Sequence, residues 1–248
     1  MIYTPQSKVV IVTGGSRGIG GATAKLLGVQ GYSVCVNYHK NDQAAEQVVT
    51  AIKSTGGQAI AVQADVSKEA DVLRLFAETK QQLGVVTHLV NNVGVLFTQS
   101  KLVDMSLTRF NSVMSNNVSS CFLCCREAIK QMQAGSAIVN VSSAASRSGA
   151  PNEYIDYAAS KGAMDALTKG LSLELAAAGI RVNGVRPGFI HTDIHADGGE
   201  PKRIERLQSQ IPLGRGGEPE EVASAIAWLL SDAASYVTGT FIDLAGGR

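Results

Sequence analysis

The segment Tyr157-Ala-Ala-Ser-Lys161 carries the clearest chemical pattern in the sequence. Residues four apart on a helix share a face, so the phenol and the ammonium can point into one cleft. A free tyrosine has a pKa of about 10, and a nearby ammonium favours the phenolate and lowers that pKa. The pair could therefore act as a general acid and base, although this spacing also occurs by chance on surface helices.

Two further polar residues precede this pair. Ser143 follows an expected strand and lies fourteen positions before Tyr157, which would place it at the mouth of the same cleft. Asn117 belongs to the preceding helical segment. Ser142 and Asn116 are the alternatives within each pair of identical neighbours, and we favour Ser143 and Asn117.

A glycine-rich turn lies near the start of the chain, in Thr13-Gly14-Gly15-Ser16-Arg17-Gly18-Ile19-Gly20. It joins an apolar run to a helical segment. Glycines at such a turn allow a tight bend and a close approach to a pyrophosphate, while the helix start offers free N–H groups. The turn predicts a dinucleotide site, although an ordinary strand-to-helix turn is the alternative.

The end of the second expected strand bears on the choice of cofactor. A carboxylate there would bind the adenosine ribose and repel a 2′-phosphate, but the sequence has Asn37 followed by Tyr38, His39 and Lys40. Together with Arg17, His39 and Lys40 suit a phosphate group. The pattern favours NADP(H), with NAD(H) as the alternative; if these residues are only solvated surface charges, the preference falls away.

Apolar runs alternate with amphipathic helical stretches along the whole chain. The expected strands are 8–13, 33–37, 58–63, 87–91, 136–142, 180–186 and 239–244. The expected helices are 18–30, 42–55, 68–83, 107–133, 157–178 and 219–231. This alternation predicts an α/β, doubly wound Rossmann-type fold with a seven-stranded parallel sheet and helices on both faces. We expect one dinucleotide-binding catalytic domain over 1–248, with the glycine- and proline-rich segment 191–217 as a substrate lid; an ordinary surface loop is the alternative.

Taken together and in chain order, these motifs resemble those of the short-chain dehydrogenase/reductase family. Asn91-Asn92-Val93-Gly94 is similar to the family's Asn-Asn-Ala-Gly motif, with Val93 in place of alanine, and Pro187-Gly188 matches its Pro-Gly. The resemblance implies that Tyr157 exchanges a proton with the substrate oxygen, Ser143 positions that oxygen and Asn117 holds a proton-relay water. It also implies that Lys161 binds the nicotinamide ribose and tunes Tyr157. The expected cofactor contacts are Thr13, Gly14, Ser16, Arg17, Gly18, Ile19, Gly20, Asn37, Tyr38, His39, Asp65, Val66, Asn91, Gly94, Tyr157, Lys161, Pro187, Gly188, Ile190 and Thr192.

The implied activity is hydride transfer between NADP(H), or NAD(H), and a carbonyl or alcohol. Glucose- and sugar-dehydrogenase-like members are the most similar, so a sugar or polyol is the expected substrate. The alternatives are a 3-oxoacyl-carrier-protein reductase and, from another class, a non-catalytic dinucleotide-binding regulator. The resemblance further implies a homotetramer that pairs the helices 107–133 and 157–178.

The composition and charge of the chain limit the classes of ligand and binding partner that we expect. The net charge is +1 over 248 residues, which gives no support to nucleic-acid binding. We expect a cytoplasmic protein without a membrane span, since residues 1–7 are polar and the next apolar run is short. We expect no metal, because His191 and His195 lack a clear third ligand, and the cysteines (Cys35, Cys121, Cys124 and Cys125) are expected to be buried thiols rather than zinc ligands.

Overall fold

The computed structural model describes residues 8–248, so the expectation about residues 1–7 lies outside the described part. The fold is the predicted α/β arrangement, with one seven-stranded parallel sheet in the order β3-β2-β1-β4-β5-β6-β7. Its strands are β1 (Val9–Val12), β2 (Ser33–Tyr38), β3 (Gln58–Gln63), β4 (His88–Asn91), β5 (Ala137–Val141), β6 (Arg181–Pro187) and β7 (Phe241–Leu244).

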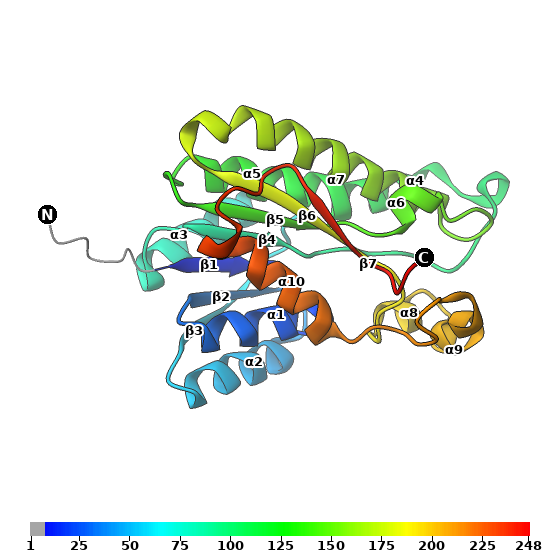
Figure 1. The fold of residues 1–248 in the computed structure, drawn as a ribbon, viewed down its shortest axis with the longest axis horizontal. Coiled ribbons are helices and arrows are strands. Elements are labelled where there is room, and N and C mark those ends of the chain that lie inside the picture. The colour runs from blue at the N-terminus through cyan, green and yellow to red at the C-terminus, as the bar shows by residue number, and fades with distance from the viewer. Residues whose placement is uncertain (1–7) are drawn as a thin grey trace, which may run out of the picture.

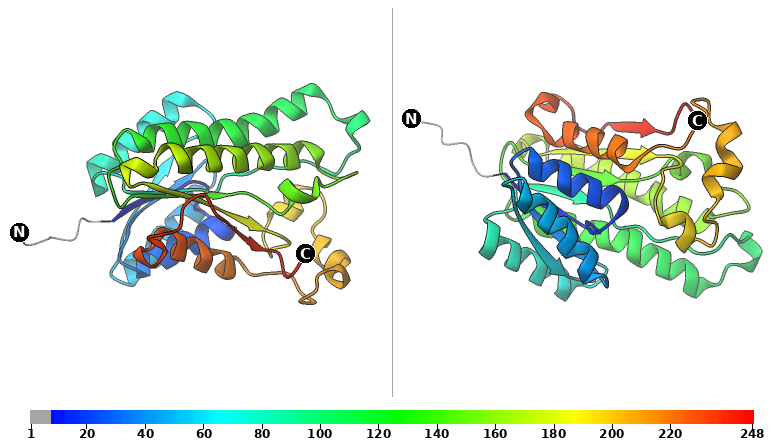
Figure 2. Two further views of the ribbon diagram at one scale, coloured as in Figure 1. Left: turned by 45° about the horizontal axis from the view of Figure 1, so that its top comes forward. Right: turned by 90° about the horizontal axis from the view of Figure 1, so that it is seen from below.

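Helices cover both faces of the sheet, with α1, α2 and α10 on one side and α3, α4, α5 and α7 on the other (Figures 1 and 2). The helices are α1 (Gly18–Val29), α2 (Asp42–Ser54), α3 (Glu69–Leu83), α4 (Leu107–Met114), α5 (Ser120–Ile129), α6 (Ala145–Ser148), α7 (Ile155–Glu174), α8 (Ile194–Asp197), α9 (Arg203–Leu207) and α10 (Pro219–Leu230). None of the described helices is long and apolar enough to cross a membrane.

The central strands are buried on both faces and mostly apolar, as expected for a doubly covered parallel sheet. All residues of β1, β4 and β5 are buried, and Val12 pairs with Val36 of β2 on one side and Val90 of β4 on the other. The four cysteines are free and buried, as predicted. Trp228, on α10, is 43% exposed and so lies outside the core.

Two long helices differ from the expected ranges. The segment 107–133 is divided by a π-helical stretch at Ser115–Ser119, and α5 ends at Ile129. The second helix begins at Ile155, ends at Glu174 and continues as a 3₁₀ turn to Gly179, whose φ of +71° stops it. Hydrophobic periodicity does not reveal a single-turn change of helix type, because one inserted residue barely alters the apolar pattern.

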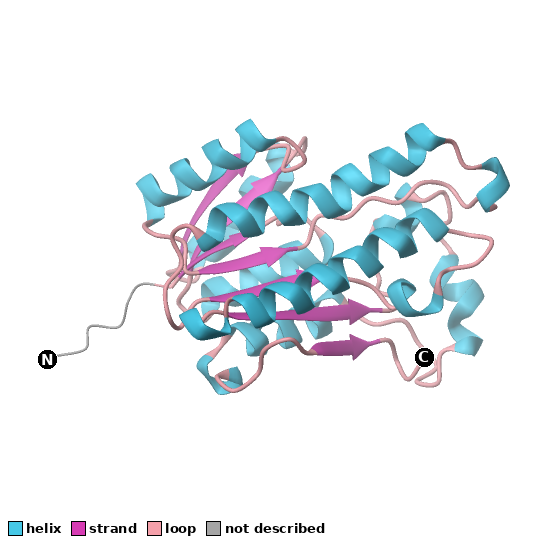
Figure 3. Ribbon diagram, turned by 90° about the horizontal axis from the view of Figure 1, so that it is seen from above, coloured by secondary structure: helices cyan, strands magenta, loops and turns pink. Residues whose placement is uncertain are grey.

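All seven strands point toward the same edge of the sheet (Figure 3). In such sheets, ligands bind beyond the carboxyl ends of the strands, at the point where the strand order reverses. That point lies between β1 and β4 here. The expected lid, 191–217, lies at this edge; it contains the short helices α8 and α9 and a 3₁₀ turn at Gln208–Gln210, rather than being without secondary structure.

Candidate active site

A cleft of about 770 Å³ runs along the carboxyl edge of the sheet. It joins the glycine turn after β1 to the ends of β2 and β3, and continues past β4 and β5 to α7 and the lid. Most of the predicted cofactor contacts line it: Gly14, Ser16, Arg17, Gly18, Ile19, Asn37, Tyr38, His39, Asp65, Val66, Gly94, Tyr157, Lys161, Pro187, Gly188, Ile190 and Thr192. Thr13, Gly20 and Asn91 are buried and do not line the cleft.

The glycine turn has the form that a phosphate requires. Gly14 and Gly18 have φ values of +60° and +52°, a region that side chains with a Cβ rarely enter. Helix α1 begins at Gly18, and no side chain caps its first N–H groups, which are therefore open to an anion. Gly20 packs on the turn itself, since a Cβ there would lie 2.3 Å from the Gly14 carbonyl oxygen.

Asn92 is a site residue that the sequence reasoning missed. Its Nδ2 donates to the carbonyls of Thr13 at 3.0 Å and Gly14 at 3.1 Å, and its backbone N–H donates to the Thr13 hydroxyl at 2.9 Å. Asn92 thereby fixes the glycine turn to the end of β4. Asn91 points away, and its buried Nδ2 donates to Asn140 Oδ1 at 2.9 Å, so the side chain that lines the cleft is that of Asn92 and not that of Asn91. The double asparagine in the motif was the available signal.

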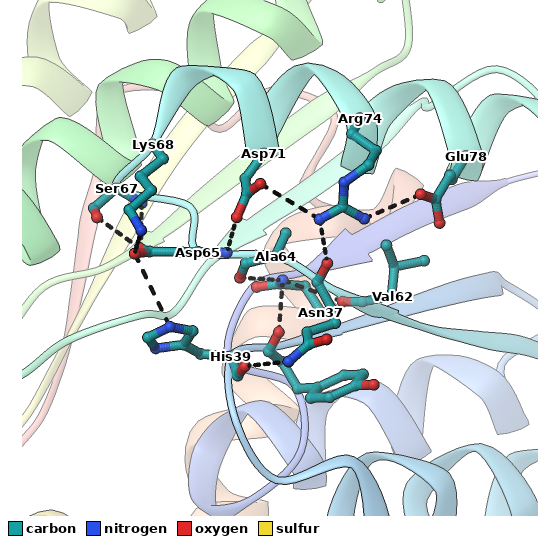
Figure 4. Close-up of polar contacts among 12 residues, drawn as sticks. Asn37, His39, Val62, Ala64, Asp65, Ser67, Lys68, Asp71, Arg74 and Glu78 are labelled. Carbon is teal, nitrogen blue, oxygen red and sulfur yellow. Dashed lines mark hydrogen bonds and ion pairs between the residues drawn. The ribbon is translucent and has the colours of Figure 1, made fainter.

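At the end of β2, the side chain of Asn37 is bonded to the backbone, as Figure 4 shows. Asn37 is buried; its Oδ1 accepts from the Gly14 N–H at 3.2 Å, and its Nδ2 donates to the Ala64 carbonyl at 3.1 Å. With its amide committed to the backbone, Asn37 acts as a support for the glycine turn. His39 and Lys40, which follow β2, line this end of the cleft and face solvent.

Asp65 is the carboxylate nearest to this end of the cleft. Its Oδ1 accepts from the backbone N–H and the hydroxyl of Ser67, at 3.1 and 2.6 Å, and its Oδ2 lies 4.0 Å from His39 Nε2 and 3.4 Å from Lys68 Nζ. Partial burial opposes ionisation, but the Ser67 hydrogen bonds and these two neighbours outweigh it, so the pKa of Asp65 is lowered. Asp65 is therefore a partnered anion beside two basic side chains.

Arg17, the expected phosphate ligand, contacts the lid. Its guanidinium pairs with Asp193 at 3.2 Å and with Asp197 at 2.5 Å. All three side chains are about half exposed, and ion pairs of this kind contribute about 0–1 kcal/mol. The cost of turning Arg17 toward a bound phosphate is correspondingly small.

At the other end of the cleft, Tyr157 lies in the first turn of α7, with the Ser143 hydroxyl facing its phenol. Burial raises the pKa of Tyr157 to about 12, while the Ser143 hydrogen bond and the charge of Arg203 act in the opposite direction. The expected lowering by Lys161 does not occur in the protein alone, since Lys161 Nζ is 5.6 Å from the ring centroid and desolvation prevails.

Lys161 is 2% exposed. Its Nζ donates to the Val141 carbonyl at 2.8 Å and lies 3.5 Å from Met164 Sδ, with no ion-pair partner among residues 8–248. Burial lowers the pKa of Lys161 to about 8, against the opposing influence of Cys121 and Asp165. Gly94 leaves room for this ammonium, because a Cβ there would lie 3.3 Å from Nζ.

The two neighbouring pairs left open by the sequence have distinct positions. Ser142 is buried and its hydroxyl donates to the Lys161 carbonyl at 3.2 Å, which leaves Ser143 facing Tyr157. Asn117 is fully buried within the π-helical stretch, where its side chain binds the N–H and the carbonyl of Val95 at 2.8 and 3.0 Å. Asn116, rather than Asn117, lines the cleft, so the Asn117 side chain fixes the loop after β4.

The two histidines of the lid have separate partners. His195 Nε2 lies 3.0 Å from the Ile190 carbonyl, while His191 Nε2 lies 3.9 Å from Glu218. His195 lines the cleft, and its pKa is lowered mainly by burial.

The family model described as Enoyl-(Acyl carrier protein) reductase matches residues 14–248. The chain is 58% identical to "Uncharacterized oxidoreductase YgfF" of Escherichia coli, over 97% of this chain and 99% of that protein. The chain belongs to the short-chain dehydrogenase/reductase family. Its site thus combines the cleft of a nicotinamide-dependent oxidoreductase with Ser143, Tyr157 and Lys161 at one end.

Other members of the short-chain dehydrogenase/reductase family match at nearly full length. Glucose 1-dehydrogenase 2 of Bacillus subtilis is 37% identical over 97% of this chain and 94% of its own. A short chain dehydrogenase from Burkholderia cenocepacia, solved in complex with NADP, has a TM-score of 0.90 and 32% identity, covering 98% of both chains. The glycine turn and the cleft along the sheet edge fit such a dinucleotide.

A pair of adjacent glycines tests the dinucleotide turn. We expect Gly20→Ala to raise the Kd of NADPH at least tenfold, about 1.4 kcal/mol, because its methyl group would displace the Gly14 carbonyl. Gly21→Ala is the matched control, since a Cβ there meets its nearest atom at 3.5 Å. Fluorescence titration measures both, and equal affinities in the two variants would contradict the assignment of this turn to the cofactor.

Proposed function

We propose that the protein is an NADP(H)-dependent reductase of carbonyl compounds that also oxidises the corresponding alcohols. The observation that carries this proposal is the meeting of Ser143, Tyr157 and Lys161 in one cleft with the glycine turn at Gly14–Gly20. A phenol, a hydroxyl and a buried ammonium at the nicotinamide end provide the groups needed to hold a carbonyl oxygen and to protonate it. When bound, the cofactor supplies the hydride.

Tyr157 is the proton donor in reduction. Because burial raises its pKa to about 12, the phenol keeps its proton at neutral pH and can give it to the developing alkoxide. Ser143 donates a second hydrogen bond to the same oxygen and so orients the carbonyl. In alcohol oxidation Tyr157 accepts the proton, and positive charge nearby stabilises its phenolate.

Lys161 supplies that positive charge and binds the cofactor. An ammonium has three donors, and Val141 O is the oxygen that accepts from this one, so Lys161 can also donate to ribose hydroxyls. Asn117 contributes indirectly by holding the loop at Val95 against α7, where its Nδ2 also donates to the Ser160 hydroxyl at 2.9 Å.

The preference for NADP(H) rests on the charges at the adenosine end of the cleft. His39 and Lys40 are exposed there, Arg17 can turn toward the same region, and the β2 end has Asn37 instead of a carboxylate. The NADP complex of the Burkholderia neighbour supports this preference by likeness.

A sugar or polyol is the proposed substrate. The lid contributes the half-buried His195 to the cleft, and with a proton on Nε2 toward the Ile190 carbonyl its Nδ1 would accept from a hydroxyl. The similarity to a glucose dehydrogenase supports the same class.

We also propose a homotetramer, since Val103 and Leu107, at the start of the α4 region, are exposed and apolar.

Replacement of the proton donor tests the catalytic assignment. Tyr157→Phe should lower kcat at least a thousandfold while changing the Kd of NADPH less than threefold, because only the hydroxyl is lost. The assay is NADPH oxidation with ethyl pyruvate and benzaldehyde, and NADP⁺ reduction with glucose. Tyr236→Phe, at a fully exposed tyrosine, is the control and should leave turnover unchanged. Tight NADPH binding without turnover in the wild type on a broad panel would instead favour a regulator.

Affinity for the two cofactors tests the phosphate preference. We expect NADPH to bind at least tenfold more tightly than NADH, and Lys40→Met to weaken NADPH several-fold without affecting NADH. Lys53→Met, on the exposed side of α2 away from the cleft, should change neither affinity. Calorimetry of the wild type, Lys40→Met and Lys53→Met gives the Kd of each cofactor. Equal affinity of the wild type for NADPH and NADH would contradict the proposed preference for NADP(H).

A further inference from the structure

A cluster of charged and polar side chains links the lid to two neighbouring segments. It consists of Arg203 and Arg206 on α9, Glu200 just before them, Glu153 just before α7, and Gln99 in the loop after β4. The cluster therefore joins three separate segments around the substrate end of the cleft.

Arg203 is the buried member of this cluster, at 7% exposure. Its Nη2 binds Glu153 Oε2, its Nη1 lies 3.4 Å from Glu200 Oε2, and its guanidinium is 4.6 Å from the centroid of the Tyr154 ring. Arg206 binds the same two carboxylates, but half of its side chain is exposed. Replacing a buried arginine that pairs with two carboxylates destabilises a protein far more than replacing an exposed one.

The lid also packs closely where this cluster holds it. A Cβ on Gly198 would lie 2.2 Å from Leu96 Cδ1 and 3.5 Å from the Tyr154 hydroxyl. The backbone N–H of Ser100 donates to the Glu153 carbonyl at 3.0 Å. The lid, the loop after β4 and the segment before α7 are thus in direct contact.

Glu153, which Arg203 binds, lies just before α7, the helix that contains Tyr157. Tyr157 follows Glu153 by four residues. On the side of α4, Arg109 Nε binds the buried Asp156 at 2.7 Å, and Asp156 accepts from the Tyr157 N–H at 2.9 Å. The start of α7 is consequently held from α4 by Arg109 and from the lid by Arg203.

The charged groups that bear on the Tyr157 phenol come from α7 and α9. Lys161 Nζ of α7 lies 5.6 Å from the ring centroid, and the positive charge of Arg203 on α9 lowers the pKa of the phenol, as does the hydrogen bond with the neutral Ser143 hydroxyl. His195 of α8 lines the same cleft, and the Arg109–Asp156 pair lies behind the backbone. Of the cations among these groups, Arg203 belongs to the lid.

We propose that Arg203 is a positioning residue that couples the closed lid to Tyr157: it fastens α9 to Glu153 at the start of the catalytic helix and places its positive charge toward the phenol. This inference rests on the proposed function. With the lid fastened, the substrate oxygen, Ser143 and Tyr157 are held together, and a displacement of about 1 Å at such a site costs about a hundredfold in rate.

The test compares Arg203→Met with Arg206→Met, which removes an arginine from the same two carboxylates, and uses NADPH with ethyl pyruvate. Arg203→Met should lower kcat ten- to a hundredfold, with the Kd of NADPH within twofold of wild type. Loss of its charge raises the pKa of Tyr157, so the alkaline decline of reduction should move to higher pH. Arg206→Met should keep kcat within threefold and leave the pH profile in place.

Arg203→Lys, which keeps the charge but not the paired geometry, should lose kcat and retain the wild-type pH profile. If Arg203→Met does not fold, Arg203→Lys and Glu153→Gln must both show the kcat loss for the proposal to stand. Equal effects of Arg203→Met and Arg206→Met, or an unmoved pH profile, would overturn it. A wild-type protein inactive on every carbonyl would refute the proposed function, whereas an active wild type with an unaffected Arg203→Met refutes only the coupling.

Discussion

The rest of the site depends on the buried ammonium of Lys161 and on the groups that stabilise its charge. Removing a cation from water without a carboxylate partner is costly, and here Val141 O is its oxygen acceptor while burial lowers its pKa to about 8. The remaining donors of the ammonium need oxygen partners, which ribose hydroxyls and an ionised Tyr157 would supply. Gly94 leaves room for this ammonium, because a Cβ there would lie only 3.3 Å from Nζ.

Buried amides hold the loops around this charge. Asn92 joins the glycine turn to β4, Asn37 joins it to β3, and Asn117 joins the loop after β4 to α7. Each of these amides binds backbone groups that no strand or helix satisfies, so the loops are fixed although they lack regular structure. The polar contacts of these three amides thus fix the loops that shape the cleft.

Much of this arrangement could be predicted from the sequence. Strand and helix alternation gives the parallel sheet, and the ends of parallel strands share an edge, so Ser143, Tyr157 and Lys161 had to meet near the glycine turn. Side-chain direction could not be predicted: Asn91 and Asn92 are identical in type, yet they face opposite sides of a strand end. The pairing of Arg17 with the lid and the raised pKa of Tyr157 depend on tertiary burial, which local patterns do not encode.

Hydride transfer to a carbonyl carbon is tested most directly with NADPH in which both hydrogens at C4 of the nicotinamide are replaced by deuterium. The purified protein is incubated with this cofactor and a carbonyl that it reduces, and the alcohol is analysed by mass spectrometry and NMR. We predict one deuterium on the carbinol carbon, with the hydroxyl proton exchanging with solvent. Reduced product without deuterium at that carbon, or NADPH binding with no reduction of any carbonyl tested, would contradict the assignment of this cleft to hydride transfer.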